Sequence, residues 1–101
     1  MVRPFNDEIL TKSEFIREFS GSLNESELTW HRDERDRTVT VIEGRGWKFQ
    51  FENSLPVELN PGDKLHIPKD SWHRLILGKG GLMLFISEGS GSENSDKIVG
   101  R

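Results

Sequence analysis

Residues 61–73 read PGDKLHIPKDSWH. Pro61 and Gly62 suit the two central positions of a type II turn, in which glycine supplies the positive φ angle. Leu65 and Ile67 flank His66, which is the two-residue period of a half-buried strand. The stretch therefore predicts a turn, a short strand, a second turn and the start of another strand.

The same period of two recurs on both sides of this stretch. Trp47, Phe49 and Phe51 alternate with polar residues, and glycine-rich turns are expected before them at 43–46 and after them at 78–81. Many short strands with regular turns indicate an antiparallel sandwich or barrel. The expected strands are 27–32, 38–43, 47–52, 55–59, 63–67, 72–77 and 82–87.

The spacing of Gly62, Pro68 and His73 resembles the second motif of the cupin superfamily: a glycine, five residues, a proline, and a histidine five positions later. Asp70 stands where the motif has a further glycine, and aspartate also tolerates left-handed backbone. Upstream, residues 39–46 look like the end of the first cupin motif. The resemblance covers about residues 27–87 and implies an all-β, cupin-type antiparallel double-sheet jelly-roll barrel.

The resemblance also implies a metal site. The paired histidines of the first motif fall on His31 and Asp33, the metal-binding glutamate falls on Arg37, and the histidine of the second motif is His73. His31 and Asp33, two residues apart on an expected strand, point to the same face. Two histidines and one carboxylate form a facial set that suits Fe, Mn, Ni or Zn. Glu34 is a reserve ligand if a bulge corrects its direction.

Arg37 leaves several interpretations open, because a guanidinium cannot ligate a cation. In the first interpretation, Arg37 points into the barrel and repels a nearby divalent cation. In the second, it pairs with Asp33 and so removes that ligand from the metal. In the third, it holds a substrate carboxylate or phosphate through two parallel hydrogen bonds. In a metal-free barrel, His31 and His73 are ordinary polar residues and Asp33 is an ion-pair partner. We assign Arg37 to substrate binding and His31, Asp33 and His73 to the metal.

Two hypotheses for the function follow. The first is a small cupin that binds a divalent metal and a small polar or anionic organic molecule. If such a protein is an enzyme, we expect it to be of the metal-dependent oxygenase or isomerase type. The alternative is a metal-free small-molecule-binding or structural module of the same fold. The fold itself does not fix a reaction.

The chain divides into three expected segments. Residues 1–23 form an N-terminal arm with a short helix, because Thr11 and Glu14 read as a capping box and Phe15, Ile16 and Phe19 fall on one helical face. Residues 24–87 form the barrel, and the low-complexity residues 88–101 form a flexible tail. The apolar content of residues 1–20 exceeds the needs of one helix, which predicts a homodimer built on this segment.

Composition excludes several classes of protein. Among 101 residues there is no cysteine, so disulfides and thiolate metal sites are absent. A net charge of −3 and a pI near 5.6 argue against nucleic-acid binding. Apolar runs are too short for a membrane span, and we expect a cytoplasmic protein.

Overall fold

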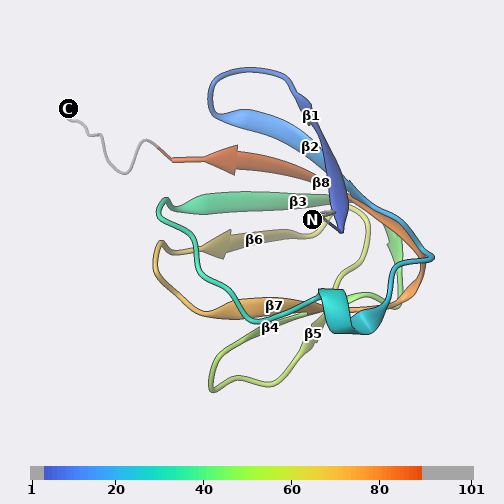
Figure 1. Cartoon of the computed structure of the whole chain (residues 1–101). Coiled ribbons are helices and arrows are strands. Elements are labelled where there is room, and N and C mark those ends of the chain that lie inside the picture. Colours follow the sequence, from blue (N-terminus) through green and yellow to red (C-terminus); the bar gives the residue numbers. More distant parts are fainter. Residues whose placement is uncertain (1–3, 90–101) are drawn as a thin grey trace.

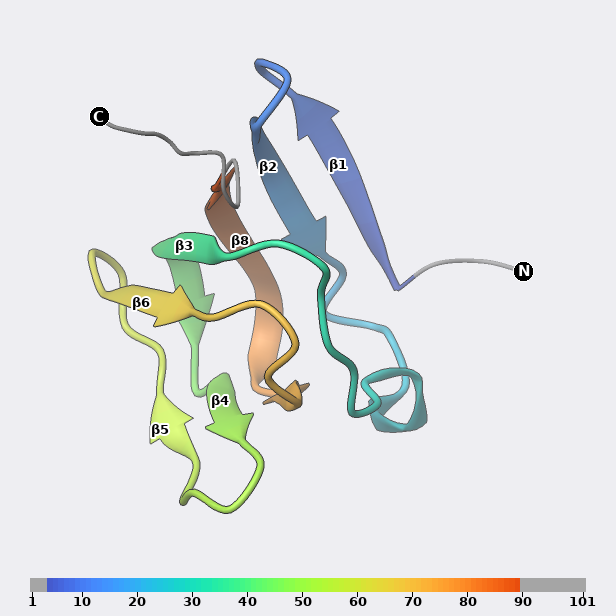
Figure 2. The same ribbon diagram turned by 90° about the vertical axis from the view of Figure 1, so that its left-hand side faces the viewer.

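Two antiparallel sheets face each other in the computed structural model, which describes residues 4–89 (Figures 1 and 2). The five-stranded sheet has the order β1-β2-β8-β3-β6, and the three-stranded sheet has the order β5-β4-β7. A 3-10 helix at Glu25–Glu27 precedes β3. The strands are β1 (Phe5–Ile9), β2 (Glu14–Phe19), β3 (Arg37–Arg45), β4 (Lys48–Phe51), β5 (Val57–Glu58), β6 (Lys64–Ile67), β7 (His73–Ile76) and β8 (Lys79–Glu88).

The core lies between the sheets and follows the alternation that the sequence predicts. Trp47 and Phe49 are buried, and Phe51 packs against the same core, so the three aromatic residues share one face. Trp47 is fully buried, and its Nε1 donates a hydrogen bond to the carbonyl of Gly80 at 3.1 Å. The five-stranded sheet contributes the buried residues Phe15, Phe19, Val39, Val41, Leu82, Leu84 and Ile86.

The predicted N-terminal helix is wrong, because Glu14–Phe19 is strand β2. Phe15 and Phe19 are four residues apart, a spacing that places side chains on one face of a helix and also on one face of a strand. Both are buried, and β2 pairs along its whole length with β8. Thr11 lies in the β1–β2 turn and Glu14 is the first residue of β2; the hydroxyl of Thr11 donates to Oε1 of Glu14 at 3.3 Å. The capping box of this chain is instead at Asn24 and Glu27, on the 3-10 helix.

Other boundaries also differ from the expectation: β5 is only Val57–Glu58, and the glycine-rich turns expected at 43–46 and 78–81 lie largely within β3 and β8. Residues 27–32 contribute no named strand, only an isolated bridge between His31 and His73. The segment after the 3-10 helix runs along β7 before it reaches β3 (Figure 1). Of the expected tail, Glu88 is the last residue of β8, and residues 90–101 lie outside the described residues.

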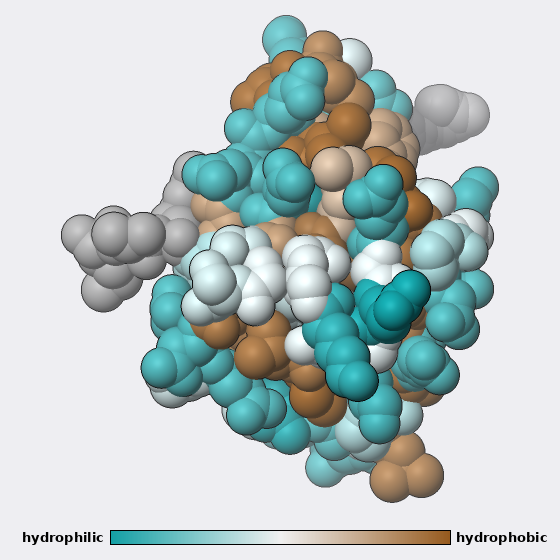
Figure 3. Space-filling model, turned by 90° about the vertical axis from the view of Figure 1, so that its right-hand side faces the viewer, coloured by the Kyte–Doolittle hydropathy of each residue, from teal (hydrophilic) through white to brown (hydrophobic). Residues whose placement is uncertain are grey.

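The hairpin β1–β2 extends the five-stranded sheet and carries exposed apolar residues. Ile9 is 69% exposed and Leu10 is 47% exposed. Figure 3 shows apolar side chains gathered toward the top of the molecule, where this hairpin lies. Within residues 4–89, no helix is both long and apolar enough to cross a membrane.

Candidate metal-binding site

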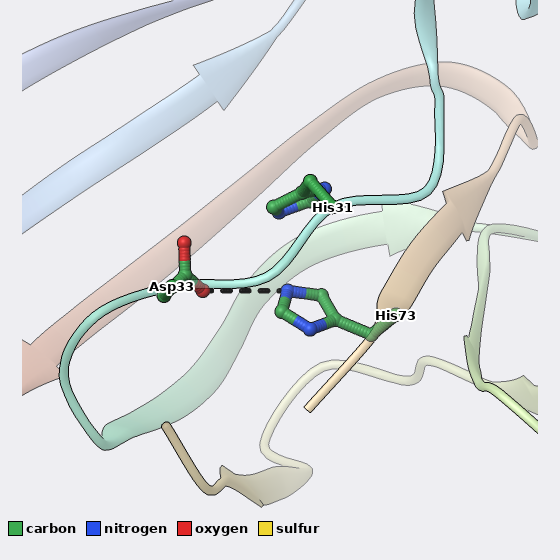
Figure 4. Close-up of side chains that lie close together, drawn as sticks. All are labelled: His31, Asp33 and His73. Atoms are coloured by element: carbon green, nitrogen blue, oxygen red, sulfur yellow. Dashed lines mark ion pairs between the residues drawn. The ribbon is translucent and has the colours of Figure 1, made fainter. Parts of the chain in front are cut away.

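The fold brings His31, Asp33 and His73 together (Figure 4). One potential ligand atom from each side chain lies within 4.8 Å of the other two. His31 and Asp33 belong to the segment before β3, whereas His73 is the first residue of β7. His73 is buried, Asp33 is half-buried and His31 is the most exposed of the three.

Backbone hydrogen bonds hold the two histidines side by side. The amide of each donates to the carbonyl of the other at 2.9 Å. The imidazole rings meet edge to face, with their centroids 4.3 Å apart. Phe49 stacks on the ring of His73 at 5.4 Å and closes off that side.

The turn at residues 68–71 anchors the segment that carries Asp33. The amide of Asp70 donates to the carbonyl of Asp33 at 2.8 Å, and the amide of Lys69 donates to Oδ1 of Asp36 at 2.8 Å. Asp70 has a φ angle of +64°, so the aspartate adopts the left-handed backbone that the sequence predicted there. The second motif thereby positions both His73 and the loop of the first motif.

The hydrogen bonds of the two rings leave Nε2 free to act as a ligand. Nδ1 of His73 lies 2.8 Å from the carbonyl of Ser71, and Nδ1 of His31 lies 3.3 Å from the carbonyl of Thr29. Because a carbonyl only accepts, each Nδ1 carries the hydrogen. In a neutral ring Nε2 then has its lone pair exposed, as in histidines that ligate metals.

Asp33 completes the group with a carboxylate oxygen that makes no hydrogen bond of ordinary geometry to any residue in the range 4–89. Its Oδ2 is buried, 3.4 Å from Nε2 of His73 and 3.3 Å from Nη1 of Arg37. Burial opposes ionisation of Asp33, but the approach of His73 and the charge of Arg37 outweigh it and hold the pKa of Asp33 below its ordinary value. Burial lowers the pKa of His31, and His73 lowers it further.

Arg37 points into the same site but is anchored on its other side. Its Nε and Nη2 donate to Oε2 of Glu88 at 3.0 and 2.8 Å. Arg37 and Glu88 stand directly opposite each other in the β3–β8 pairing. The pairing with Asp33 that the sequence left open is therefore present, and the assignment of Arg37 to substrate binding stays a prediction.

A cavity of about 420 Å³ adjoins this group. His31, Asp33, Arg37 and His73 line its polar end. The remaining lining is mostly apolar and comes from both sheets, including Val39, Phe49, Leu65, Ile67, Leu75, Leu84 and Ile86. The site is thus a polar cluster at one end of an apolar chamber.

Several other candidates lie outside the site. Glu34, Glu43 and His66 are exposed and do not join the cluster. Arg74 lies elsewhere, where its guanidinium covers Trp30 at 4.7 Å and its Nε donates to Oε1 of Gln50 at 2.9 Å.

Sequence reasoning missed Glu88, Phe49 and Arg17 as neighbours of the site. Glu88 is 51 residues from Arg37, and only the strand register reveals the pair. Phe49 was assigned to the core, and its stacking on His73 depends on how β4 pairs with β7. Arg17 lines the cavity because residues 14–19 form a strand of the sheet instead of an outer helix.

No family model matches the sequence, and no curated protein sequence matches it significantly. Solved structures do match. HppE, determined with Co(II) and substrate, superposes with a TM-score of 0.64 over 84% of this chain at 17% identity. A putative mannose-6-phosphate isomerase from Ralstonia eutropha JMP134 superposes with a TM-score of 0.60 over 83% of this chain and 81% of its own, at 20% identity. The chain has a cupin fold.

Another structural neighbour of this chain carries a different name. A structure described as DMSP lyases RdDddP and RnDddQII superposes with a TM-score of 0.63 at 19% identity, over 84% of this chain and 42% of that one. This chain spans about half the length of HppE. Sequence identities of 17–20% establish the fold and leave the activity open.

Proposed function

We propose that this cupin binds one divalent transition metal through Nε2 of His31, Nε2 of His73 and the carboxylate of Asp33, and that the adjoining cavity holds a small polar or anionic organic molecule. The observation that carries the proposal is that one potential ligand atom from each of the three side chains lies within 4.8 Å of the other two, and that Oδ2 of Asp33 is buried.

The three side chains fit a metal. With Nδ1 protonated, a neutral His73 turns the lone pair of Nε2 toward Oδ2 of Asp33 at 3.4 Å, so two acceptors face each other. A cation between them removes this repulsion. Metal–ligand bonds of about 2.1 Å place ligands at most about 4.2 Å apart, so the present spread of up to 4.8 Å closes by a small rotation of the exposed His31. Nitrogen and oxygen donors without thiolate suit Fe, Mn, Ni or Zn.

A bound metal would supply a Lewis acid and a template for an oxygen-containing ligand. The chain's own residues do the rest. Arg37 provides a fixed positive charge beside the metal position, and the apolar walls exclude water from the ligand. HppE was solved with Fe(II) and with Co(II), which supports, by likeness of fold, the proposed divalent metal. If this cupin is an enzyme, we propose that it is of the metal-dependent oxygenase or isomerase type.

Isothermal titration with Mn(II), Fe(II), Ni(II) and Zn(II) tests the metal site. We expect one site per chain in the wild type, no binding by His73→Ala, and unchanged binding by His66→Ala. His66 is the matched control, because it is an exposed histidine on β6 outside the cluster. Absence of binding in the wild type, or equal loss in both variants, would overturn the proposal.

The second candidate is a metal-free binding module, and Arg37 is the observation that favours it. Its Nη1 lies 3.3 Å from the Asp33 oxygen that a metal would use. If the wild type binds no metal while Arg37→Glu does, the natural protein is the metal-free module. A homodimer remains part of the proposal, with hairpin β1–β2 as the contact.

A further inference from the structure

We propose that the organic ligand of this site is a monocarboxylate with an apolar body, and that Nη1 of Arg37 recognises its carboxylate once Asp33 serves the metal. This inference rests on the proposed metal site and names the class of ligand that the site takes. It follows from three features: the division of the cavity into two chemical ends, the hydrogen bonds of Arg37, and the charge of the cluster.

The cavity separates polar from apolar groups. Away from the four residues of the polar cluster, most of the lining is apolar, both aliphatic and aromatic: Phe19, Val39, Phe49, Leu65, Ile67, Leu75, Leu84 and Ile86. A hydroxyl placed against such walls loses its hydrogen bonds to water and gains none, which costs free energy. The ligand therefore has its polar group at one end and an apolar body, and a polyhydroxylated molecule is a poor fit.

The remaining polar residues of the lining are Arg17, Glu27 and Thr29. Nε and Nη2 of Arg17 are held by the two carboxylate oxygens of Asp7 at 2.8 and 3.0 Å, and its guanidinium covers the ring of Phe5. Glu27 and Thr29 are exposed. A cavity of 420 Å³ equals the liquid volume of about fourteen water molecules, which is room for a ring or a short branched chain.

One side of the Arg37 guanidinium is hydrogen-bonded to Glu88, and the other side, which carries Nη1, faces Asp33. Oε2 of Glu88 accepts hydrogen bonds from Nε and Nη2 of Arg37, which fixes the plane of the guanidinium. Within residues 4–89, Nη1 contacts Oδ2 of Asp33 at 3.3 Å and without hydrogen-bond geometry. When the carboxylate of Asp33 ligates a cation, the cation neutralises its charge, and the ion pair with Nη1 of Arg37 weakens. A ligand carboxylate beside the metal position then restores a charged partner for Nη1.

The charge of the cluster selects a monoanion. Arg37, Asp33 and Glu88 together carry one net negative charge when the histidines are neutral. A divalent cation makes the net charge one positive. A monocarboxylate then brings the half-buried cluster to neutrality, whereas a dianionic phosphate leaves it negative, and uncompensated charge in such a site is unfavourable.

Titration calorimetry with four probes tests the inference on wild-type protein, with and without saturating Zn(II). Cyclohex-1-enecarboxylate is the expected ligand. Shikimate has the same ring and carboxylate but adds three hydroxyls, cyclohex-1-enecarboxamide removes the charge, and phenyl phosphate supplies a dianion. We expect only cyclohex-1-enecarboxylate to bind well, and at least about tenfold more tightly with Zn(II) than without it.

Two variants separate recognition by Arg37 from a general effect. Arg37→Gln should keep Zn(II) binding and lose the carboxylate, whereas Arg74→Gln, which changes an arginine outside the cavity, should keep both. Equal binding of shikimate or phenyl phosphate, or a carboxylate affinity independent of Zn(II) or of Arg37, overturns the inference while leaving the metal site intact. Failure of Zn(II) itself to bind overturns the proposed function, and the inference falls with it.

Discussion

Nε2 of His73 lies 3.4 Å from Oδ2 of Asp33, while Nδ1 on the other side of the ring lies 2.8 Å from the carbonyl of Ser71. This arrangement fixes the tautomer of the ring and aims its free nitrogen at a carboxylate. A proton or a metal cation between the two atoms makes the contact attractive. Competition between protons and metal for this position gives the first prediction.

Metal affinity should be constant near pH 7–8 and should fall as the pH drops below about 6. The pKa of His31 lies below its ordinary value and that of Asp33 is also lowered, so both ligands are in their metal-binding forms at neutral pH. Acidification adds a proton to the imidazole of His31 and displaces the metal. Calorimetric titrations from pH 5 to pH 8 measure this dependence, and affinity that rises on acidification would contradict it.

Arg37→Glu should strengthen metal binding by at least about tenfold, because the change removes a repelling charge and adds a carboxylate. The same change should lower the melting temperature of the metal-free protein, because the new carboxylate faces Glu88 and Asp33. Calorimetric titration and thermal unfolding measure the two effects. Weaker metal binding by the variant would show that Arg37 supports the site in a way that its charge does not explain.

Asp70 should accept glycine but resist alanine. Its backbone has a φ angle of +64°, and its amide anchors Asp33. We expect Asp70→Ala to be less stable than the wild type by about 1 kcal/mol, since alanine lacks the tolerance of aspartate for this conformation. Asp70→Gly should stay within about 0.5 kcal/mol of the wild type. Chemical denaturation measures both, and equal stability of the two variants would contradict the assigned backbone strain.

The protein should be a homodimer at high micromolar concentration. Strand β1 is the outer strand of the five-stranded sheet, and the adjacent Ile9 and Leu10 are exposed. Light scattering should give a dimer mass for the wild type and a monomer mass for Ile9→Lys. Leu55→Lys is the control, because Leu55 is 86% exposed and lies far from this hairpin in the sequence. A monomer mass for the wild type would refute the prediction.

Much of the fold could be predicted from the sequence because the alternation of apolar residues is a local signal. The face shared by Trp47 and Phe49, and the turn at Gly62 with its positive φ angle, followed from neighbouring residues alone. The same reasoning failed for Phe15 and Phe19, because a spacing of four suits both a helix and a strand. Pairing with β8, more than sixty residues away in the chain, settles the strand.

The candidate site was predictable as a set of residues and unpredictable as an arrangement. The spacing of the two motifs selected His31, Asp33 and His73, which the structure brings together even though residues 27–32 form no regular strand. Whether they hold a metal stays a prediction. The anchoring of Arg37 by Glu88 depends on the register of β3 against β8, and no local pattern contains it.

A crystal soaked in Zn(II) and measured at the zinc absorption edge tests the central claim most directly. We predict one anomalous peak within about 2.0–2.2 Å of Nε2 of His31, Nε2 of His73 and a carboxylate oxygen of Asp33. The absence of a peak in the cavity at saturating Zn(II), with Oδ2 of Asp33 still beside Nη1 of Arg37, would contradict the account.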